Sequence, residues 1–548
     1  MNDQTSRTFK DLSVQNVANF LQTVVVVDDQ ARLPQQPTNN DTTSKSDISK
    51  ADNESPVGAH ANLVSPEPDT AGPPVDPKDL DAKCLVDGFA KEGIACTILC
   101  PASDDNVVTQ ANKIAEVADI VVLDWILDRD NGERTTKLIR KLISEENGSD
   151  RIRLIAIYTG ESDLRAIADK VSELLSTRFG EAPDRPSEFV AVKGPVRLAV
   201  FAKSHTPVPR EDTVLSKRRV ATSELPDRLI HEFAEMTTGL LPNVAIAGLS
   251  EIRAQTHKLL TMFSYSLDPA YLGHRLLLSN PSEAEDEVVT MLVAEVLSIL
   301  EHGSVAKQAG IDSIRAWINE MTKKKSLRPR QLFDHPQDSE DTLLGLLEDG
   351  FDNTPDVQIG KRKLEKVTHA FTLEDSFADE SNRQFAKMMH VKTRYRGRPP
   401  SLTLGTILFS KSDPCDTFWI CLQPKCDSVR IKERRSFPMV PMVQVKDQKD
   451  DFEIVVKHRG CWVLLRVPRR PAEINMFTFE PDDASMEQVA ATPNGSTWNF
   501  TPIEGPSFEW VADLKDEHAQ RIANEFAGSF SRVGVNESEW VRRSRRNR

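Results

Sequence analysis

Residues 118–142 read ADIVVLDWILDRDNGERTTKLIRKL, the pattern of a buried strand followed by a turn and a helix. Ile120 to Leu123 are all apolar, and the strand that they predict ends at Asp124. A polar turn leads to Gly132, and apolar residues then recur at helical spacing. The stretch therefore predicts a carboxylate at the carboxyl end of a buried strand.

The same alternation of strand and helix surrounds this stretch. Apolar runs predict three more strands, at residues 23–29, 94–100 and 152–160. Amphipathic segments between and after them predict three more helices, at residues 79–93, 105–117 and 162–178. Strands that are apolar throughout and alternate with helices are typical of a parallel sheet covered on both faces. We expect residues 1–232 to form a doubly wound α/β domain.

Residues 31–80 interrupt this pattern. They contain eight prolines and no aromatic residue, and Ser, Thr, Asn and Asp are frequent among them. Such a segment buries too little apolar surface to offset the entropy of ordering it. We expect a disordered insertion in the α/β domain.

Three further regions follow. The apolar spacing predicts a helical region at residues 233–325, and a charged connecting region covers residues 326–398. Short apolar runs separated by turn residues predict a β-rich domain at residues 399–548, a small barrel or sandwich. This last domain ends in a helix near residues 514–530 and a basic tail.

The composition limits where the protein works and what it binds. No apolar run reaches the roughly 18 residues that span a bilayer, and the first ten residues lack the apolar core of a secretory signal. Seven cysteines in 548 residues indicate reduced thiols. We expect a cytoplasmic protein without a membrane partner. The net charge of −14 also argues against nucleic acid as a partner.

Polar residues end several of the predicted strands. Asp28 and Asp29 follow the first strand, Asp124 follows the third, and Thr159 ends the fourth. Ligands of an open parallel sheet bind at the carboxyl ends of its strands. Clustered carboxylates favour a hard cation such as Mg²⁺ or Mn²⁺, and one carboxylate can also act as a nucleophile towards phosphorus.

This set of residues resembles the receiver domain of two-component response regulators. The motif VVVVDD matches the first strand and acidic pair of receivers, VVLDWILDRDNG their phosphoacceptor loop, and LIAIYTG their threonine strand. The 95 residues from Asp29 to Asp124 exceed the usual spacing by about the fifty that the insertion supplies.

The resemblance implies a five-stranded, flavodoxin-like receiver domain. Asp124 would accept phosphate from a sensor histidine kinase, and Thr159 would orient the phosphoryl group. Asp28, Asp29, Asp124 and the backbone carbonyl of Ile126 would bind Mg²⁺. Such a protein is not an enzyme in the usual sense, since it catalyses only its own phosphorylation and dephosphorylation.

Receivers also carry a lysine at the end of the last strand, and three lysines are candidates for it. Lys193, Lys203 and Lys217 all end apolar runs, and none is followed directly by the proline that is usual in receivers. We favour Lys203, because it ends the longest run and a hairpin turn is predicted before it. The aromatic residue that often precedes this lysine by three positions is Val200 here.

Other motifs beyond residue 232 give weaker signals. Residues 304–321 have a spacing like that of a helix-turn-helix, but a plain pair of amphipathic helices explains it better. Cys415, Cys421, Cys426 and Cys461 lack the spacing of a zinc site, so we expect buried small side chains there. We found no catalytic motif.

The layout of the whole chain resembles the receiver proteins of bacterial anti-phage phosphorelays of the Detocs type. The features that carry this resemblance are the insertion, the segment ELPDRLIHEFAEMTTGLLPN and the ending SFSRVGVNESEWVRR. In those systems, a receiver protein without an effector domain is thought to act as a phosphate sink beside a receiver-containing effector. The alternatives are a DNA-binding transcriptional regulator and an effector whose β-rich domain is an unrecognised enzyme. The oligomeric state stays open.

Overall fold

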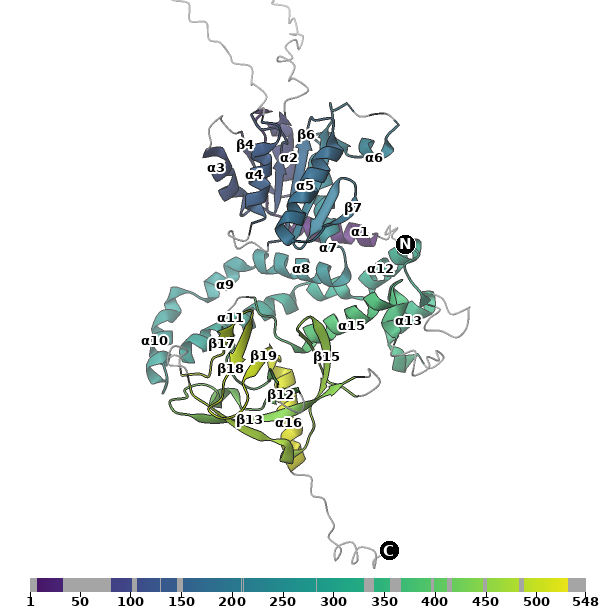
Figure 1. Cartoon of the computed structure of the whole chain (residues 1–548). Coiled ribbons are helices and arrows are strands. Elements are labelled where there is room, and N and C mark those ends of the chain that lie inside the picture. Colours follow the sequence, from purple (N-terminus) through teal and green to yellow (C-terminus); the bar gives the residue numbers. More distant parts are fainter. Residues whose placement is uncertain are drawn as a thin grey trace, which may run out of the picture. The chain divides into compact units, whose positions relative to one another are not determined.

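The computed structural model describes most of the chain in two compact units, Met1–Lys324 and Lys325–Arg548. The described residues are 7–32, 80–100, 106–128, 130–144, 151–207, 209, 211–281, 283–329, 340–354, 366–395, 399–411, 416–446, 451–481 and 487–530. Figure 1 shows the elements of both units.

An eight-stranded sheet forms the centre of the first unit. Five consecutive strands run parallel to one another, in the order β4 (Ala95–Leu99), β1 (Thr23–Val27), β5 (Ile120–Leu123), β6 (Arg153–Thr159) and β9 (Val196–Lys203). Three further strands extend the sheet: β8 (Val190–Lys193) and β7 (Asp184–Ser187) are antiparallel, and the short β10 (Arg219–Val220) pairs in parallel with β9. The parallel α/β fold is as expected, but the sheet is wider than the five strands predicted.

Alternate residues of the parallel strands enter two separate cores. Val25, Val27, Val121 and Leu123 face one core, and the residues between them face the other. Helices α3 (Asn106–Ala115), α4 (Glu133–Leu142) and α5 (Leu164–Phe179) cover the first face. Helices α1 (Phe9–Phe20), α2 (Ala82–Lys91) and α7 (Leu225–Thr237) cover the second (Figure 1). The strands are therefore apolar throughout because both faces of the sheet are buried.

Helices also fill the region that was predicted to be helical. They are α8 (Leu240–Ala254), α9 (Thr256–Met262), η2 (Tyr265–Leu267), α10 (Asp268–Leu277), α11 (Glu283–His302), η3 (Val305–Ala309) and α12 (Ile311–Lys323). The expected pair of amphipathic helices at residues 304–321 is instead a 3-10 helix, η3, followed by α12. A further short helix, α6 (Thr213–Ser216), precedes β10.

No single helix in the described residues is long and apolar enough to cross a membrane. Helix α11 and the segment Val305–Lys323, which are bent by 60° relative to each other, meet the length and composition criteria only when taken together.

The predicted insertion lies outside the described residues except for its ends. There, β2 (Ala31–Arg32) pairs in parallel with β3 (Leu80–Asp81), and the amide of Leu80 donates to the carbonyl of Gln30 at 3.1 Å. The two ends of the insertion are therefore held side by side, just after the first strand of the sheet.

The second unit contains a nine-stranded antiparallel sheet. Its order is β14 (Ile454–His458), β15 (Cys461–Arg466), β13 (Arg435–Val445), β12 (Thr417–Cys421), β11 (Thr406–Ser410), β19 (Phe508–Asp513), β18 (Thr497–Phe500) and β17 (Thr492–Asn494), with β16 (Asn475–Phe479) beside β13. The sheet curls, since the ring Nε2 of His458 on β14 lies 3.1 Å from Oε1 of Glu509 on β19.

Helices and short 3-10 turns accompany this sheet. They are α13 (Glu340–Asp349), η5 (Phe351–Asn353), η6 (Val367–Phe371), α15 (Asp375–His390), η7 (Lys425–Asp427), η8 (Pro471–Glu473) and α16 (Asp516–Phe530). Helix α16 buries Ala519, Ile522 and Phe526 in one of the two cores of the unit.

The cysteines of this unit correct one expectation. Cys421 is buried, but Cys426 and Cys461 are exposed rather than buried as we expected. Cys461 begins β15 directly after a tight turn, where its side chain has no core to enter. Cys415 and the basic tail lie outside the described residues.

Candidate phosphoacceptor site

The polar residues predicted to end strands meet at one edge of the first sheet. Asp28 follows β1, Asp124 follows β5, Thr159 ends β6 and Lys203 ends β9. These four strands are consecutive neighbours and parallel, so their carboxyl ends share one edge. The fold therefore brings together residues that are up to 175 positions apart in the chain.

Lys203 lies between two of the carboxylates. Its Nζ donates to Oδ2 of Asp28 at 2.8 Å and to Oδ2 of Asp124 at 2.7 Å, and all three side chains are buried. The other two candidate lysines lie elsewhere. Lys193 pairs with Glu181 at 2.8 Å, and Lys217 is an exposed residue at the end of α6.

Asp28, Asp29 and Asp124 form a group that can hold a metal ion. One carboxylate oxygen from each lies within 4.8 Å of the others, and no other group of three or more His, Cys, Asp or Glu with such geometry occurs in the described residues. Oδ2 of Asp29 accepts the amide N–H of Asp128 at 2.8 Å, whereas its Oδ1 is buried and has no hydrogen-bond partner. Because a buried carboxylate oxygen needs a partner, this orphaned atom fits a hard divalent cation.

The pKa values at the site reflect burial and charge. Burial raises the pKa of Asp124 to about 6, although Lys203 pulls it down. Burial lowers the pKa of Lys203, but the charges of Asp124 and Asp28 outweigh this effect and raise it overall. Lys203 is therefore a permanent cation, while Asp124 titrates near neutrality.

The loop after β5 shows why a glycine follows Asp124 by eight residues. Gly132 has φ of 84°, and a Cβ there would lie 2.6 Å from Cζ2 of Trp125. Asp130 closes the turn, with Oδ1 accepting the amide N–H of Gly132 at 3.1 Å and Oδ2 that of Arg134 at 2.5 Å. The half-buried Ile126 lies in this loop, and its carbonyl as a metal ligand stays a prediction.

Thr159 adds a hydroxyl to the site. Its Oγ1 accepts the amide N–H of Glu161 at 3.3 Å, and its hydrogen bond to Asp124 lowers the pKa of that carboxyl group. Val200, which stands where receivers often have an aromatic residue, is fully buried in the core of the sheet.

Two neighbouring residues were missed by sequence reasoning. The hydroxyl of Thr135, on α4, donates to the backbone carbonyl of Asp124 at 2.8 Å and fixes the start of the loop. The ring of Tyr158 lies 6.0 Å from Nζ of Lys203, and its hydroxyl donates to the carbonyl of Val220 at 3.0 Å. The sequence could have pointed to Tyr158, because it directly precedes Thr159. Nothing in the sequence points to Thr135.

Comparison with known families agrees with this geometry. Residues 20–208, which include Asp28, Asp29, Asp124, Thr159 and Lys203, match the family model of the response receiver domain. The chain contains a receiver domain. Searches of curated proteins and of solved structures gave no match. A receiver domain indicates a phosphoacceptor role in two-component signalling, and residues beyond 208 are not covered by the match.

Proposed function

We propose that the protein is a cytoplasmic phosphoacceptor that receives a phosphoryl group on Asp124 from a sensor histidine kinase. The observation that carries this proposal is the cluster of Asp28, Asp29, Asp124, Thr159 and Lys203 at one edge of the receiver sheet. In this reaction a carboxylate oxygen of Asp124 attacks phosphorus in line. The P–O bond forms as the P–N bond of the phosphohistidine breaks, and the histidine leaves as an imidazole.

Each residue of the cluster has a part in this transfer. Mg²⁺ held by Asp28, Asp29 and Asp124 would neutralise charge that develops on the phosphoryl oxygens. Lys203 is a second fixed positive charge, already within hydrogen-bond distance of Asp124. The hydroxyl of Thr159 donates to a phosphoryl oxygen once it is present. The chain then catalyses only its own phosphorylation and dephosphorylation.

The test uses intact mass after incubation with acetyl phosphate and Mg²⁺. We expect a gain of about 80 Da, one phosphoryl group, which Asp124→Asn abolishes. Asp128→Asn is the matched control, since Asp128 lies in the same loop with φ of 57°, a conformation that asparagine tolerates. A gain that persists in Asp124→Asn, or that is lost equally in the control, would sink the proposal.

We also propose, from the resemblance to Detocs-type receiver proteins, that phosphate transfer to this chain drains a kinase that it shares with an effector. Loss of Asp124 then removes a competing acceptor. Asp124→Ala should raise effector phosphorylation in unstimulated cells that contain the kinase. A transcriptional activator predicts silencing of its target instead. Effector phosphorylation that is unchanged or lower would rule out the sink but leave the phosphoacceptor chemistry standing.

A further inference from the structure

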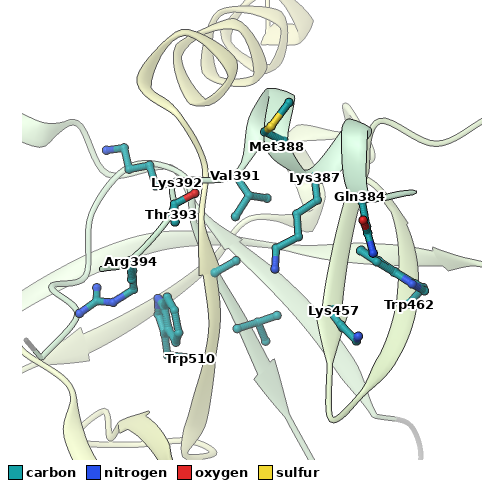
Figure 2. A pocket seen from close by; sticks show the side chains of 12 residues that line it. Gln384, Lys387, Met388, Val391, Lys392, Thr393, Arg394, Lys457, Trp462 and Trp510 are labelled. Carbon is teal, nitrogen blue, oxygen red and sulfur yellow. The ribbon is translucent and has the colours of Figure 1, made fainter. Parts of the chain in front are cut away.

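A pocket of about 550 Å³ lies in the second unit. Its walls come from the end of α15 and residues 391–394, from the β14–β15 hairpin, and from β19 (Figure 2). Its charged and aromatic side chains include those of Lys387, Arg394, Lys457, Trp462 and Trp510. The pocket is within the range of sizes that accept small organic ligands.

The lining of this pocket is strongly basic. Lys387, Lys392, Arg394 and Lys457 line it together with uncharged residues, and no carboxylate is among the lining side chains. Since the whole chain carries a net charge of −14, this concentration of positive charge is local. The pocket therefore attracts anions, although the chain as a whole repels them.

Within the described part of the chain, two of these cations form salt bridges and two do not, although the charge of Glu380 attracts that of Lys457. Lys392 pairs with Asp516 at 2.6 Å, and Arg394 lies 3.7 Å from Asp513. For Lys387 and Lys457, the described residues provide no salt bridge. Figure 2 shows Lys387 extending between the two sides of the pocket. Lys387 and Lys457 are thus the groups available to an incoming anion.

Each side of the pocket also carries an indole held in place by a carboxylate. Nε1 of Trp462 donates to Oε2 of Glu380 at 2.6 Å, and Nε1 of Trp510 donates to Oδ2 of Asp513 at 3.2 Å. Nζ of Lys457 lies 5.5 Å from the ring centre of Trp462, and Cζ of Arg394 lies 5.1 Å from that of Trp510. Both indoles are half-buried, and Figure 2 shows them on opposite sides of the pocket. Each of the two pairs, Lys457–Trp462 and Arg394–Trp510, thus places a positive charge beside a planar ring.

We propose that this pocket binds a nucleoside phosphate. The base packs against an indole, and Lys387 and Lys457 contact the phosphate oxygens. A simple inorganic anion would use the cations alone, and an uncharged ring would use the indoles alone. A ligand that carries both a planar base and phosphate satisfies the whole lining, since a base stacks favourably on an aromatic side chain.

The test is calorimetric titration of the full-length protein with ATP, GTP, adenosine and inorganic phosphate. EDTA is present, so that the metal site of the receiver domain does not contribute. We expect ATP or GTP to bind, with adenosine and inorganic phosphate each at least about tenfold weaker. Lys387→Gln combined with Lys457→Gln should weaken nucleotide binding by more than about tenfold.

A matched control separates the pocket from general surface charge. Lys432→Gln removes an exposed cation of the same unit that does not line the pocket, and it should leave the affinity unchanged. Three results would overturn the proposal: no nucleotide binding, inorganic phosphate binding as tightly as ATP, or equal losses in the double variant and the control. Tighter binding of a single-stranded oligonucleotide than of ATP would also overturn it, in favour of a nucleic-acid surface.

Discussion

The ammonium group of Lys203 lies between two buried carboxylates. Its contacts with Asp28 and Asp124 neutralise charge that burial would otherwise make costly. The elevated pKa of Asp124 shows that this compensation is incomplete, because burial still favours the neutral carboxyl group. A second positive charge at the receiver site would therefore stabilise the ionised carboxylate of Asp124.

The first prediction concerns removal of this ammonium group. Lys203→Met should lower the free energy of unfolding by about 3 kcal/mol at pH 8 without Mg²⁺, because it leaves two buried carboxylates uncompensated. Saturating Mg²⁺ should restore part of the loss, since the ion binds the folded state. Urea denaturation measures both effects.

Lys193→Met is the control for this variant. Lys193 is also a strand-end lysine in an ion pair, but its partner Glu181 is 75% exposed. Such a pair contributes less than about 1 kcal/mol. Equal losses in the two variants would show that Lys203 has no special electrostatic role.

The second prediction concerns pH. Asp124 has a pKa of about 6, so it becomes protonated as the pH falls from 7.5 to 5 and then no longer attracts a cation. Protonation of Asp124 over this range should lower the affinity for Mg²⁺ about tenfold. The fluorescence of Trp125, which lies beside the site, measures this affinity. The Asp124→Asn variant should bind Mg²⁺ more weakly than the wild type, and its affinity for Mg²⁺ should change less with pH. A wild-type affinity that is constant over this range would contradict the assignment.

At the scale of elements, the β5–α4 loop is shaped by one glycine and one aspartate. Gly132 takes a left-handed conformation against the ring of Trp125, and Asp130 accepts three amide N–H groups, those of Leu127, Gly132 and Arg134. Glycine is needed for two separate reasons, the backbone angle and the space. A substitution can distinguish them, because another helix end of the same domain requires only the angle.

Gly180 provides that comparison for the third prediction. Gly180 ends α5 with φ of 70°, and nothing lies within 4 Å of a Cβ built there. Gly180→Ala should therefore lower the free energy of unfolding by about 1 kcal/mol, from backbone strain alone. Gly132→Ala should cost about 2 kcal/mol more, since Trp125 must move, and it should also weaken Mg²⁺ binding. Similar losses of stability in the two variants would mean that the ring of Trp125 can move aside at no cost in free energy.

At the scale of the whole molecule, the receiver domain accommodates a long insertion next to its acidic pair. The ends of the insertion pair through β2 and β3, and the amide of Gln30 donates to Oδ1 of Asp28 at 2.8 Å. The chain is thus fixed by hydrogen bonds at both ends of the insertion. Loop-closure entropy rises only slowly with loop length, so the fold is insensitive to the number of residues between these ends.

The fourth prediction follows from that anchoring. Replacing residues 35–76 by a short Gly/Ser linker should leave phosphorylation by acetyl phosphate and the Mg²⁺ affinity unchanged. Mass spectrometry and the titration above measure the two quantities. A variant that misfolds, or that loses the phosphoryl gain, would show that the insertion is part of the receiver fold.

Local patterns in the sequence were sufficient for the parallel strands and for the acidic residues at their ends. Continuous apolar runs indicate strands buried on both faces, and a polar residue at the end of such a run is visible without the fold. Strand β13 was missed, because Pro438 and Pro441 interrupt a run that is otherwise strand-like. Helix α1 was missed as well, although its Thr8–Asp11 capping box is present in the sequence.

Which of these residues meet depends on how the whole chain folds. The sequence alone predicted Asp28, Asp29, Asp124 and Thr159, since each directly follows or ends an apolar strand. It favoured Lys203 without excluding two other lysines, and only the sheet order places that lysine beside the acids. The basic pocket had no sequence signal, because Lys387, Lys457 and Trp510 belong to separate elements that the curled sheet brings together. Strand identity follows from neighbouring residues, whereas a site depends on contacts that only chain folding creates.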